Sequence, residues 1–224
     1  MGSASQARLV VLISGRGRNL QALIEAVRDG RIPAQLTAVV CNRADAEGLA
    51  HAREAGIPVE LVPHRDYPDR AAFDAALGAA LRRHAPDVIA MAGFMRVLGD
   101  GLVREFEGRM LNIHPSLLPK YPGLDTHGRA LAAGDAEHGA TVHFVIPALD
   151  NGPAVIQGRI ALRRGDDAQA LAQRVLEEVE LKIYPQAVAW IARGELKLEA
   201  GAALLRGRRL AGPMNMDDLE EAFT

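Results

Sequence analysis

Three polar side chains form a candidate reaction centre in this sequence. Asn112 and His114 are two residues apart in the segment NIHPSLLP, at the end of an apolar run, residues 110–113, that is typical of a buried strand. Alternate side chains of a strand project to the same face, so both could reach one reacting group. Asp150, in the turn LDNGP, is a candidate partner that would keep the imidazole protonated and hold its ring orientation. The alternative is structural, because lone histidines are often structural and an aspartate in such a turn is commonly a turn former.

A second candidate is the glycine-rich loop SGRGRN, residues 14–19, which follows another apolar run. Its glycines allow a tight turn, and the helix predicted after it would present free N–H groups and the positive end of its dipole to a phosphate. Arg16 and Arg18 add positive charge. The loop is not a dinucleotide fingerprint, because Leu20 occupies the third glycine position and the second strand ends in CNR instead of an acidic residue. A simple tight turn is the alternative.

A third candidate is the apolar segment AGFMRVL, residues 92–98, which holds one arginine at a strand end. Its backbone could pair with the polar edges of a flat ring while its side chains cover the ring. The alternative is ordinary core packing around a solvated Arg96.

The apolar pattern predicts the elements that position these segments. Short apolar runs alternate with helical periodicity, which implies right-handed βαβ crossovers, a Rossmann-like, mostly parallel central sheet, and helices on both of its faces. Ligands of such sheets bind beyond the carboxyl ends of the strands, where the three candidate segments lie. Strands are expected at residues 8–13, 36–40, 58–62, 87–92 and 110–113, and helices at residues 19–28, 44–55 and 69–84.

The second half is expected to be loop-rich, because three prolines and a glycine interrupt residues 115–123. Residues 141–146 and 155–162 are predicted to be extended. Asp166 is the predicted N-cap of a long helix towards Arg193, kinked or broken at Pro185. A terminal hairpin is expected at residues 195–206. We therefore predict a single α/β domain over residues 7–210, followed by a tail, residues 211–224, that is a frayed helix or disordered.

Composition limits the partners and the compartment. The chain has 224 residues, 49% of them hydrophobic, and a net charge of −2, which predicts a folded core and no attraction to a nucleic acid. One cysteine excludes an internal disulfide, and no metal-binding motif is present, so we expect a metal-independent protein. Residues 1–6 lack the pattern of a secretory signal, and no apolar run approaches the roughly 18 residues that cross a bilayer. A cytoplasmic protein without membrane contact is expected, either a monomer or a homodimer.

Four segments together resemble one enzyme family. SGRGRNLQAL, AGFMRVL, LNIHPSLLPKYPGLDTH and HGATVHFVIPALDNGP are similar to the glycinamide ribonucleotide formyltransferases, and the likeness covers about residues 8–210. The segment NIHPSLLP is shared across the superfamily of folate formyl hydrolases and transferases, whereas KYPGLDTH and SGRGRNLQ point to the glycinamide branch. The resemblance implies transfer of a formyl group from 10-formyltetrahydrofolate, a co-substrate, to the amine of 5'-phosphoribosylglycinamide, in de novo purine (IMP) biosynthesis.

The resemblance also implies a role for each matching residue. Asn112, His114 and Asp150 match the catalytic trio, in which the amide and the protonated imidazole stabilise an oxyanion and the carboxylate keeps the imidazole protonated. The phosphate loop would lie in the N-terminal half and the folate site mainly in the C-terminal half. The residues that match the ribonucleotide site are Gly17, Arg18, Asn19, Pro115 and Glu180. Those that match the folate site are Arg70, Met95, Arg96, Val97, Leu98, Asn112, Ile146 and Asp150.

Two positions depart from the family pattern. Arg18 stands where a small serine is usual, so its guanidinium could contact the phosphate together with backbone N–H groups. Leu181 replaces the histidine that commonly follows the substrate-binding glutamate, which leaves the alignment of Glu180 open.

Three other functions are weighed against this one. A methionyl-tRNA formyltransferase would need an RNA-binding domain and a basic face, which 224 residues at a net charge of −2 do not suit. A formyltetrahydrofolate hydrolase uses similar catalytic residues but adds an N-terminal regulatory domain, whereas here the first strand is expected near residue 8. A non-catalytic nucleotide-binding regulator would leave Asn112 and His114 without a purpose.

Overall fold

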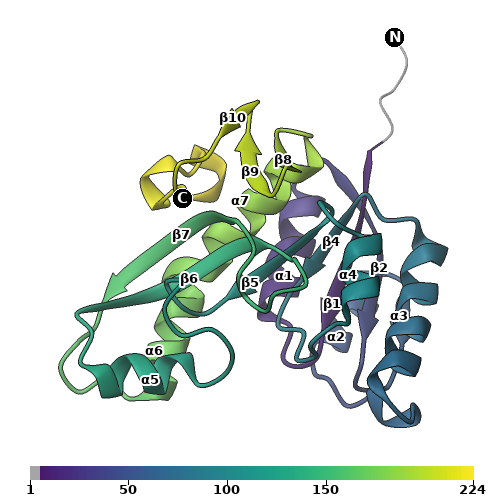
Figure 1. Ribbon diagram of the computed structural model, residues 1–224, viewed down its shortest axis with the longest axis horizontal. Helices are drawn as coiled ribbons and strands as arrows, with labels where there is room; N and C mark the ends of the chain where they lie inside the picture. The colour runs from purple at the N-terminus through teal and green to yellow at the C-terminus, as the bar shows by residue number, and fades with distance from the viewer. Residues whose placement is uncertain (1–5) are drawn as a thin grey trace.

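A seven-stranded sheet forms the centre of the molecule in the computed structural model, which describes residues 6–224 (Figure 1). The strand order is β3-β2-β1-β4-β5-β6-β7, in which the first five strands are parallel and β6 and β7 are antiparallel to their neighbours. The predicted α/β class with a mostly parallel sheet is confirmed. The strands are Ala7–Ile13 (β1), Ala34–Cys41 (β2), Val59–Leu61 (β3), Val88–Met91 (β4), Met110–His114 (β5), Glu137–Phe144 (β6) and Ala154–Ala161 (β7).

Helices cover both faces of this sheet, as the sequence predicts. Alternate residues of β1 enter two separate apolar cores: Leu9 and Val11 pack with one set of helices, and Val10 and Leu12 with the other. A strand that is buried on both faces must be apolar throughout, which explains the unbroken run LVVLI after Arg8. The first core contains α1 (Arg18–Arg28), α2 (Leu49–Glu54), α6 (Ala168–Val175) and α7 (Leu181–Ala192), and the second contains α3 (Arg70–His84) and α4 (Asp100–Glu105).

Several element boundaries differ from the predictions. The helix expected at residues 44–55 begins only at Leu49, because residues 44–48 turn to bring Gly48 against the loop after β1, where its N–H donates to Gly15 O over 2.9 Å. The strand expected at residues 141–146 is β6, which begins at Glu137 and ends at Phe144. Two helices were not predicted, α4 and α5 (Thr126–Ala133), since both are short and α5 follows the proline-rich segment.

The long helix predicted from Asp166 is also different in detail. Its N-cap is Asp167, whose carboxylate accepts from Ala170 N, whereas Asp166 pairs with Arg174 at 2.8 Å. The helix is interrupted by a π turn, Leu176–Glu180, and not at Pro185. Pro185 lies inside α7. It has no N–H group to donate to the carbonyl four residues earlier, which belongs to the first residue of α7. The missing hydrogen bond therefore falls at the junction with the π turn, and the helix continues past Pro185.

The C-terminal region is more ordered than predicted. The expected hairpin is present as β8 (Leu196–Glu199) and β9 (Ala202–Leu205), extended by a short strand β10 (Arg208–Arg209). The tail forms two 3₁₀ turns, Met216–Asp218 and Glu221–Phe223, and Phe223 is buried in the first core. The expectation of a frayed helix or disorder in residues 211–224 was therefore wrong, while the division into domain and tail at residue 210 stays a prediction.

Two findings bear on the predicted compartment. Within residues 6–224, none of the helices is both long and apolar enough to span a bilayer. The polar N-terminus, on which the prediction of no secretory signal rests, lies almost entirely outside the described residues, since these begin at residue 6.

Candidate active site

Strands β5 and β6 place the candidate catalytic side chains on one face of the sheet. Asn112 and His114 alternate along β5 and therefore share a face. In the antiparallel register Asn112 lies opposite His143, and His114 lies opposite Thr141. Directly opposed residues in a sheet have neighbouring side chains, so four polar groups meet at this point.

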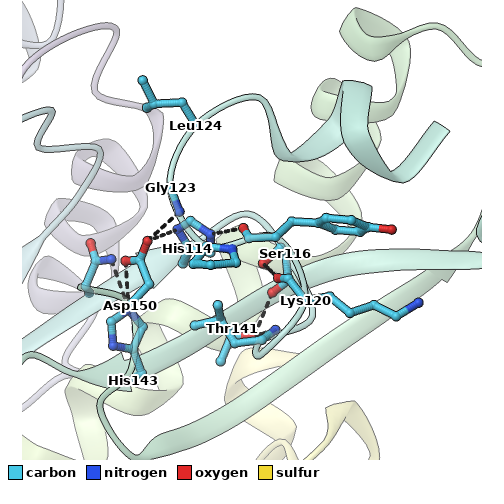
Figure 2. A network of polar contacts seen from close by, with 12 residues as sticks. His114, Ser116, Lys120, Gly123, Leu124, Thr141, His143 and Asp150 are labelled. Carbon is cyan, nitrogen blue, oxygen red and sulfur yellow. Dashed lines mark hydrogen bonds and ion pairs between the residues drawn. The ribbon is translucent and has the colours of Figure 1, made fainter. Parts of the chain in front are cut away.

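The turn between β6 and β7 brings Asp150 to His114, as the sequence predicts. The distance from His114 Nδ1 to Asp150 Oδ2 is 3.5 Å, and both side chains are less than one tenth exposed (Figure 2). The other ring nitrogen, Nε2, lies 2.9 Å from the carbonyl oxygen of Tyr121. A carbonyl oxygen only accepts, so Nε2 carries a proton, and a second proton on Nδ1 would face the carboxylate. The protonated imidazole is thus the form whose two N–H groups both face acceptors.

The loop between β5 and α5 supplies two of the contacts to this pair. Gly123 N donates to Asp150 Oδ2 over 2.8 Å, and Tyr121 provides the carbonyl to His114. Thr141 anchors the loop from β6, because its hydroxyl donates to Ser116 O at 2.6 Å and accepts from Leu118 N at 3.1 Å (Figure 2). The loop is therefore held on the same strand that carries His143.

Sequence reasoning missed His143, which completes the cluster. Its Nε2 atom lies 3.1 Å from Asn112 Nδ2 and 3.8 Å from Asp150 Oδ1, and the residue is buried (Figure 2). Burial lowers the pKa of His143, and nearby His114 acts in the same direction. The signal that would have found it is the strand register, since only the pairing of β5 with β6 places it opposite Asn112.

An apolar cleft of about 510 Å³ opens beside the trio. Its rim carries side chains that are unusually exposed for their type, among them Leu124 at 79% and Met95 at 67%. A narrower recess of about 50 Å³ adjoins it deeper in the molecule and is lined by Leu98 and Ile146. Exposed apolar side chains around a cleft are typical of a ligand site. The predicted site residues that line one or both hollows are Met95, Arg96, Val97, Leu98, Asn112, His114, Pro115, Ile146 and Asp150.

The predicted phosphate loop lies at the carboxyl end of β1, beside β4. Gly17 is the N-cap of α1 with φ 74°, and no side chain caps the helix, so its first N–H groups are open to a ligand. A Cβ atom on Gly17 would stand 2.6 Å from Gly48 Cα, so this position requires glycine. Arg18 is exposed at the first turn.

The structure places Glu180 beside this loop, although the two are 161 residues apart in sequence. Asn19 Nδ2 donates to Glu180 Oε2 over 2.6 Å, and the Oδ1 atom of Asn19 is buried without a partner. Burial raises the pKa of Glu180, which the hydrogen bond from Asn19 opposes. The carboxylate and the amide oxygen together form an acceptor site suited to a donor such as an amine.

Arg70 is the one predicted folate residue that lines neither hollow. It is exposed at the start of α3, and its charge, with that of Arg96, lowers the pKa of Asp74, which burial raises more strongly. Arg70 and Arg96 therefore both lie near the Asp74 carboxylate. In residues 6–224 no group of three or more histidine, cysteine or acidic side chains is arranged to hold a metal ion.

Comparison with known proteins decides the family. Residues 7–188, more than three quarters of the chain, match the formyl transferase family. This chain belongs to the formyl transferase family. Among curated members, the phosphoribosylglycinamide formyltransferase of Escherichia coli is 47% identical over 202 residues, which cover 90% of this chain and 95% of that protein. The human trifunctional purine biosynthetic protein adenosine-3 is 42% identical over 193 residues, 86% of this chain but 19% of that protein.

Solved structures of formyl transferases have the same fold. The phosphoribosylglycinamide formyltransferase of Coxiella burnetii, in complex with CHES, superimposes with a TM-score of 0.88 at 44% identity, covering 94% of this chain and all of that one. Glycinamide ribonucleotide transformylase 1 from Symbiobacterium toebii gives a TM-score of 0.87 at 41% identity, covering 91% of this chain and 95% of that one. The similarity thus extends over both halves of this formyl transferase.

Proposed function

We propose that the protein is a phosphoribosylglycinamide formyltransferase, which moves the formyl group of 10-formyltetrahydrofolate to the amine of 5'-phosphoribosylglycinamide in purine biosynthesis. The observation that carries the proposal is the position of the Asn112, His114 and Asp150 cluster. It borders an apolar cleft of about 510 Å³. The segment after β4 that lines this cleft is hydrogen-bonded to the glycine-rich loop after β1, because Met95 N donates to the hydroxyl of Ser14. One reaction centre thus has a ring-binding hollow and a phosphate-binding loop within a single chain.

The ribonucleotide would bind through the glycine-rich loop after β1 and through Glu180, at the end of the π turn before α7. Open N–H groups of α1 beside Gly17 suit the phosphate, and the exposed guanidinium of Arg18 adds a charge. Glu180 and Asn19 would accept hydrogen bonds from the glycinamide amine and orient it. Pro115, at the mouth of the cleft, would bound the path of the amine towards His114.

The folate would bind along the segment from Met95 to Leu98, with Ile146 and Asp150 on the opposite side. Backbone groups at both edges suit the hydrogen-bonding pattern of a pteridine, and the apolar side chains would exclude water. The deeper recess, at about 50 Å³, is smaller than the roughly 150 Å³ cavity that holds a benzene molecule. The recess would therefore have to widen to admit a ring, and the exposed side chains of Val97 and Leu149 are among those that line it. Arg70 and Arg96 would face the anionic glutamate end.

The proposed chemistry follows from charges at the reaction centre. Attack of the amine on the formyl carbon places negative charge on the former carbonyl oxygen, and Asn112 Nδ2 and protonated His114 would stabilise it. The excess proton on the attacking nitrogen must leave, and the folate nitrogen must gain one as the C–N bond breaks. His114 would mediate this transfer through Nδ1, the ring nitrogen that is not hydrogen-bonded to Tyr121 O, and Asp150 at 3.5 Å would stabilise its charged form. No step requires a metal ion.

A coupled assay tests this function. Purified protein with 10-formyltetrahydrofolate and phosphoribosylglycinamide should release tetrahydrofolate, followed by absorbance, and form the formylated ribonucleotide, followed by mass. Omission of the amine should abolish turnover, whereas formate release without it would indicate a hydrolase instead. Turnover should be unchanged after dialysis against a chelator. Absence of product with both substrates would refute the proposal.

We also propose that the enzyme acts in the cytoplasm on small molecules, with no nucleic-acid or membrane partner. The proposed oligomeric state is a monomer or a homodimer.

A further inference from the structure

The proposed folate-binding segment, residues 95–98, has few contacts of its own that would fix its backbone. Met95, Arg96 and Val97 are consecutive and exposed, between the buried residues Phe94 and Leu98. The segment belongs to no helix or strand, so no ladder of backbone hydrogen bonds holds it. A backbone that is to recognise a flat ring must nevertheless be fixed to within a fraction of an ångström. Something outside the segment must supply that rigidity.

Ser14, at the carboxyl end of β1, bonds to one end of this segment. Its hydroxyl accepts from Met95 N over 2.8 Å and donates to Asn42 Oδ1 over 2.6 Å. Ser14 and Asn42 are both nearly inaccessible to solvent, at 4% and 3% exposure. The hydroxyl is thus locked by two strands of the sheet and directed at a single backbone N–H group.

Asp74, on α3, bonds to the other end. Its Oδ2 atom accepts from Gly99 N over 2.7 Å, while Oδ1 is buried without a partner. A Cβ atom on Gly99 would stand 2.5 Å from Asp74 Oδ2, so the close approach depends on glycine at this position. The segment is therefore held at its two ends by side chains from two different elements, Ser14 directly after β1 and Asp74 on α3.

We propose that Ser14 and Asp74 are positioning residues for the folate, which tether the two ends of the segment from Met95 to Gly99 and hold its backbone in the geometry that binds the pteridine. This inference rests on the proposed function for the identity of the ligand. Neither residue lines the cleft or the recess, so neither is expected to touch the folate. Both act through the backbone N–H groups that they accept from.

The tether at Asp74 can be tested by matched variants. Asp74→Leu removes the acceptor, whereas Gly99→Ala keeps the aspartate but pushes its carboxylate away from the N–H group of residue 99. Each should raise the KM for 10-formyltetrahydrofolate about fivefold, the equivalent of one hydrogen bond, with kcat and the KM for the ribonucleotide within about twofold of wild type. Asp74→Asn keeps an acceptor oxygen and should retain the wild-type KM. A raised KM in Asp74→Asn equal to that of Asp74→Leu would show that charge matters and the tether does not.

The tether at Ser14 has its own control. Ser14→Ala should raise the folate KM by a similar factor, whereas Thr37→Val should not, although it also removes a hydroxyl bonded to the β1 backbone, at 3.2 Å from Leu9 O. Amide hydrogen exchange provides a readout independent of turnover: exchange at Met95 should accelerate in Ser14→Ala, and at Gly99 in Asp74→Leu and Gly99→Ala. Unchanged exchange in soluble variants, or parallel rises in the KM for both substrates, would overturn the proposal.

Calorimetric titration with tetrahydrofolate separates this inference from the proposed function. If wild type binds tetrahydrofolate but does not turn over, the proposed function fails, and weaker binding by Ser14→Ala and Asp74→Leu would still support the tethers. If wild type turns over and the variants bind tetrahydrofolate as it does, the proposed function stands and the tethers are refuted. If wild type neither turns over nor binds tetrahydrofolate, both are refuted.

Discussion

The Nε2 atom of His143 lies 3.1 Å from Nδ2 of Asn112. Nδ1 of the same ring lies 2.9 Å from Phe144 O, which only accepts, so Nδ1 carries the proton of the neutral ring and Nε2 can accept. Burial lowers the pKa of His143 and favours that neutral ring. The amino group of Asn112 must then face His143, which uses one of its N–H groups and leaves the other for the reacting oxygen. The orientation of the proposed oxyanion donor is therefore set by a neighbouring histidine.

Replacement of His143 should lower turnover without weakening binding. His143→Leu removes the acceptor, so the Asn112 amide can rotate, and we expect kcat to fall about tenfold to a hundredfold, as for a misplaced oxyanion donor. His143→Gln places an amide oxygen near the position of Nε2 and should retain most of the activity. Steady-state kinetics with both substrates would measure this. If His143 acts through Asn112, adding His143→Leu to Asn112→Ala should cost no further activity, and a full additive loss would contradict that role.

Asp150→Asn should reduce kcat by at least about a hundredfold, because His114, the proposed proton-transfer group, loses the charge that stabilises its protonated form, and the KM of either substrate should change little. The amide oxygen can still accept from Gly123 N, so the loop contact at 2.8 Å is retained while the charge facing His114 is lost. Thermal unfolding should confirm that the variant is folded. Turnover equal to that of wild type would remove Asp150 from the mechanism.

Glu180→Gln should separate stability from substrate binding. Burial raises the pKa of Glu180, so its ionised form costs more free energy in the folded protein than in the unfolded chain. A neutral amide of the same shape should therefore raise the melting temperature. The same change should increase the KM for phosphoribosylglycinamide about tenfold, since a charged acceptor for the amine is lost. Asp217→Asn, at an exposed carboxylate in a distant turn, serves as the control for charge removal. A less stable variant with normal KM would contradict the prediction.

The fold should lose stability in mild acid because of buried histidines. Burial lowers the pKa of His127 from 6.5 to about 4, with His138 acting in the same direction. Between these values an unfolded chain binds a proton at His127 that the folded chain does not, so the contribution of His127 to the free energy of unfolding should fall as pH decreases from 6.5 to about 4. The pKa values of His138 and His143 are lowered mainly by burial as well. Denaturant titrations across this pH range would measure the slope, and His127→Gln should reduce it. An unchanged slope would contradict the assignment.

The C-terminal turns should contribute measurably to stability. Phe223 is buried at 4% exposure, and Glu220 accepts from Trp190 Nε1 at 3.0 Å and from Arg193 at 2.8 Å. Phe223→Ala should lower the free energy of unfolding by about 3 kcal/mol, the usual cost of removing a buried phenyl ring. Thr224→Ala, at the exposed neighbouring position, should change it by less than about 0.5 kcal/mol. Equal stability of both variants would show that the tail contributes nothing.

Local pattern predicted the regular elements well where burial dictated residue type. The unbroken apolar runs at β1 and β4 and the helical stripe of α1 match the structure closely, because strands buried on both faces and helices packed on a sheet constrain every turn of the chain. Prediction was weaker where neighbouring residues are equally suited to the same role. Both Asp166 and Asp167 suit an N-cap, and only the packing of Arg174 against Asp166 assigns the cap to Asp167. The helix α5 was missed because its neighbouring prolines and glycine conceal its pattern.

The sequence by itself determined the sheet, the strand end that carries Asn112 and His114, and the glycine-rich loop, since these depend on residues a few positions apart. It also placed Asp150 in a turn after β6. Only the tertiary structure decided which groups meet: the antiparallel register puts His143 against Asn112, and the π turn before α7 puts Glu180 against Asn19, 161 residues away. The apolar periodicity of a segment reflects how that segment is buried. The register of two strands and the packing of two distant segments depend on the side chains of both, and the local pattern of one segment does not contain this information.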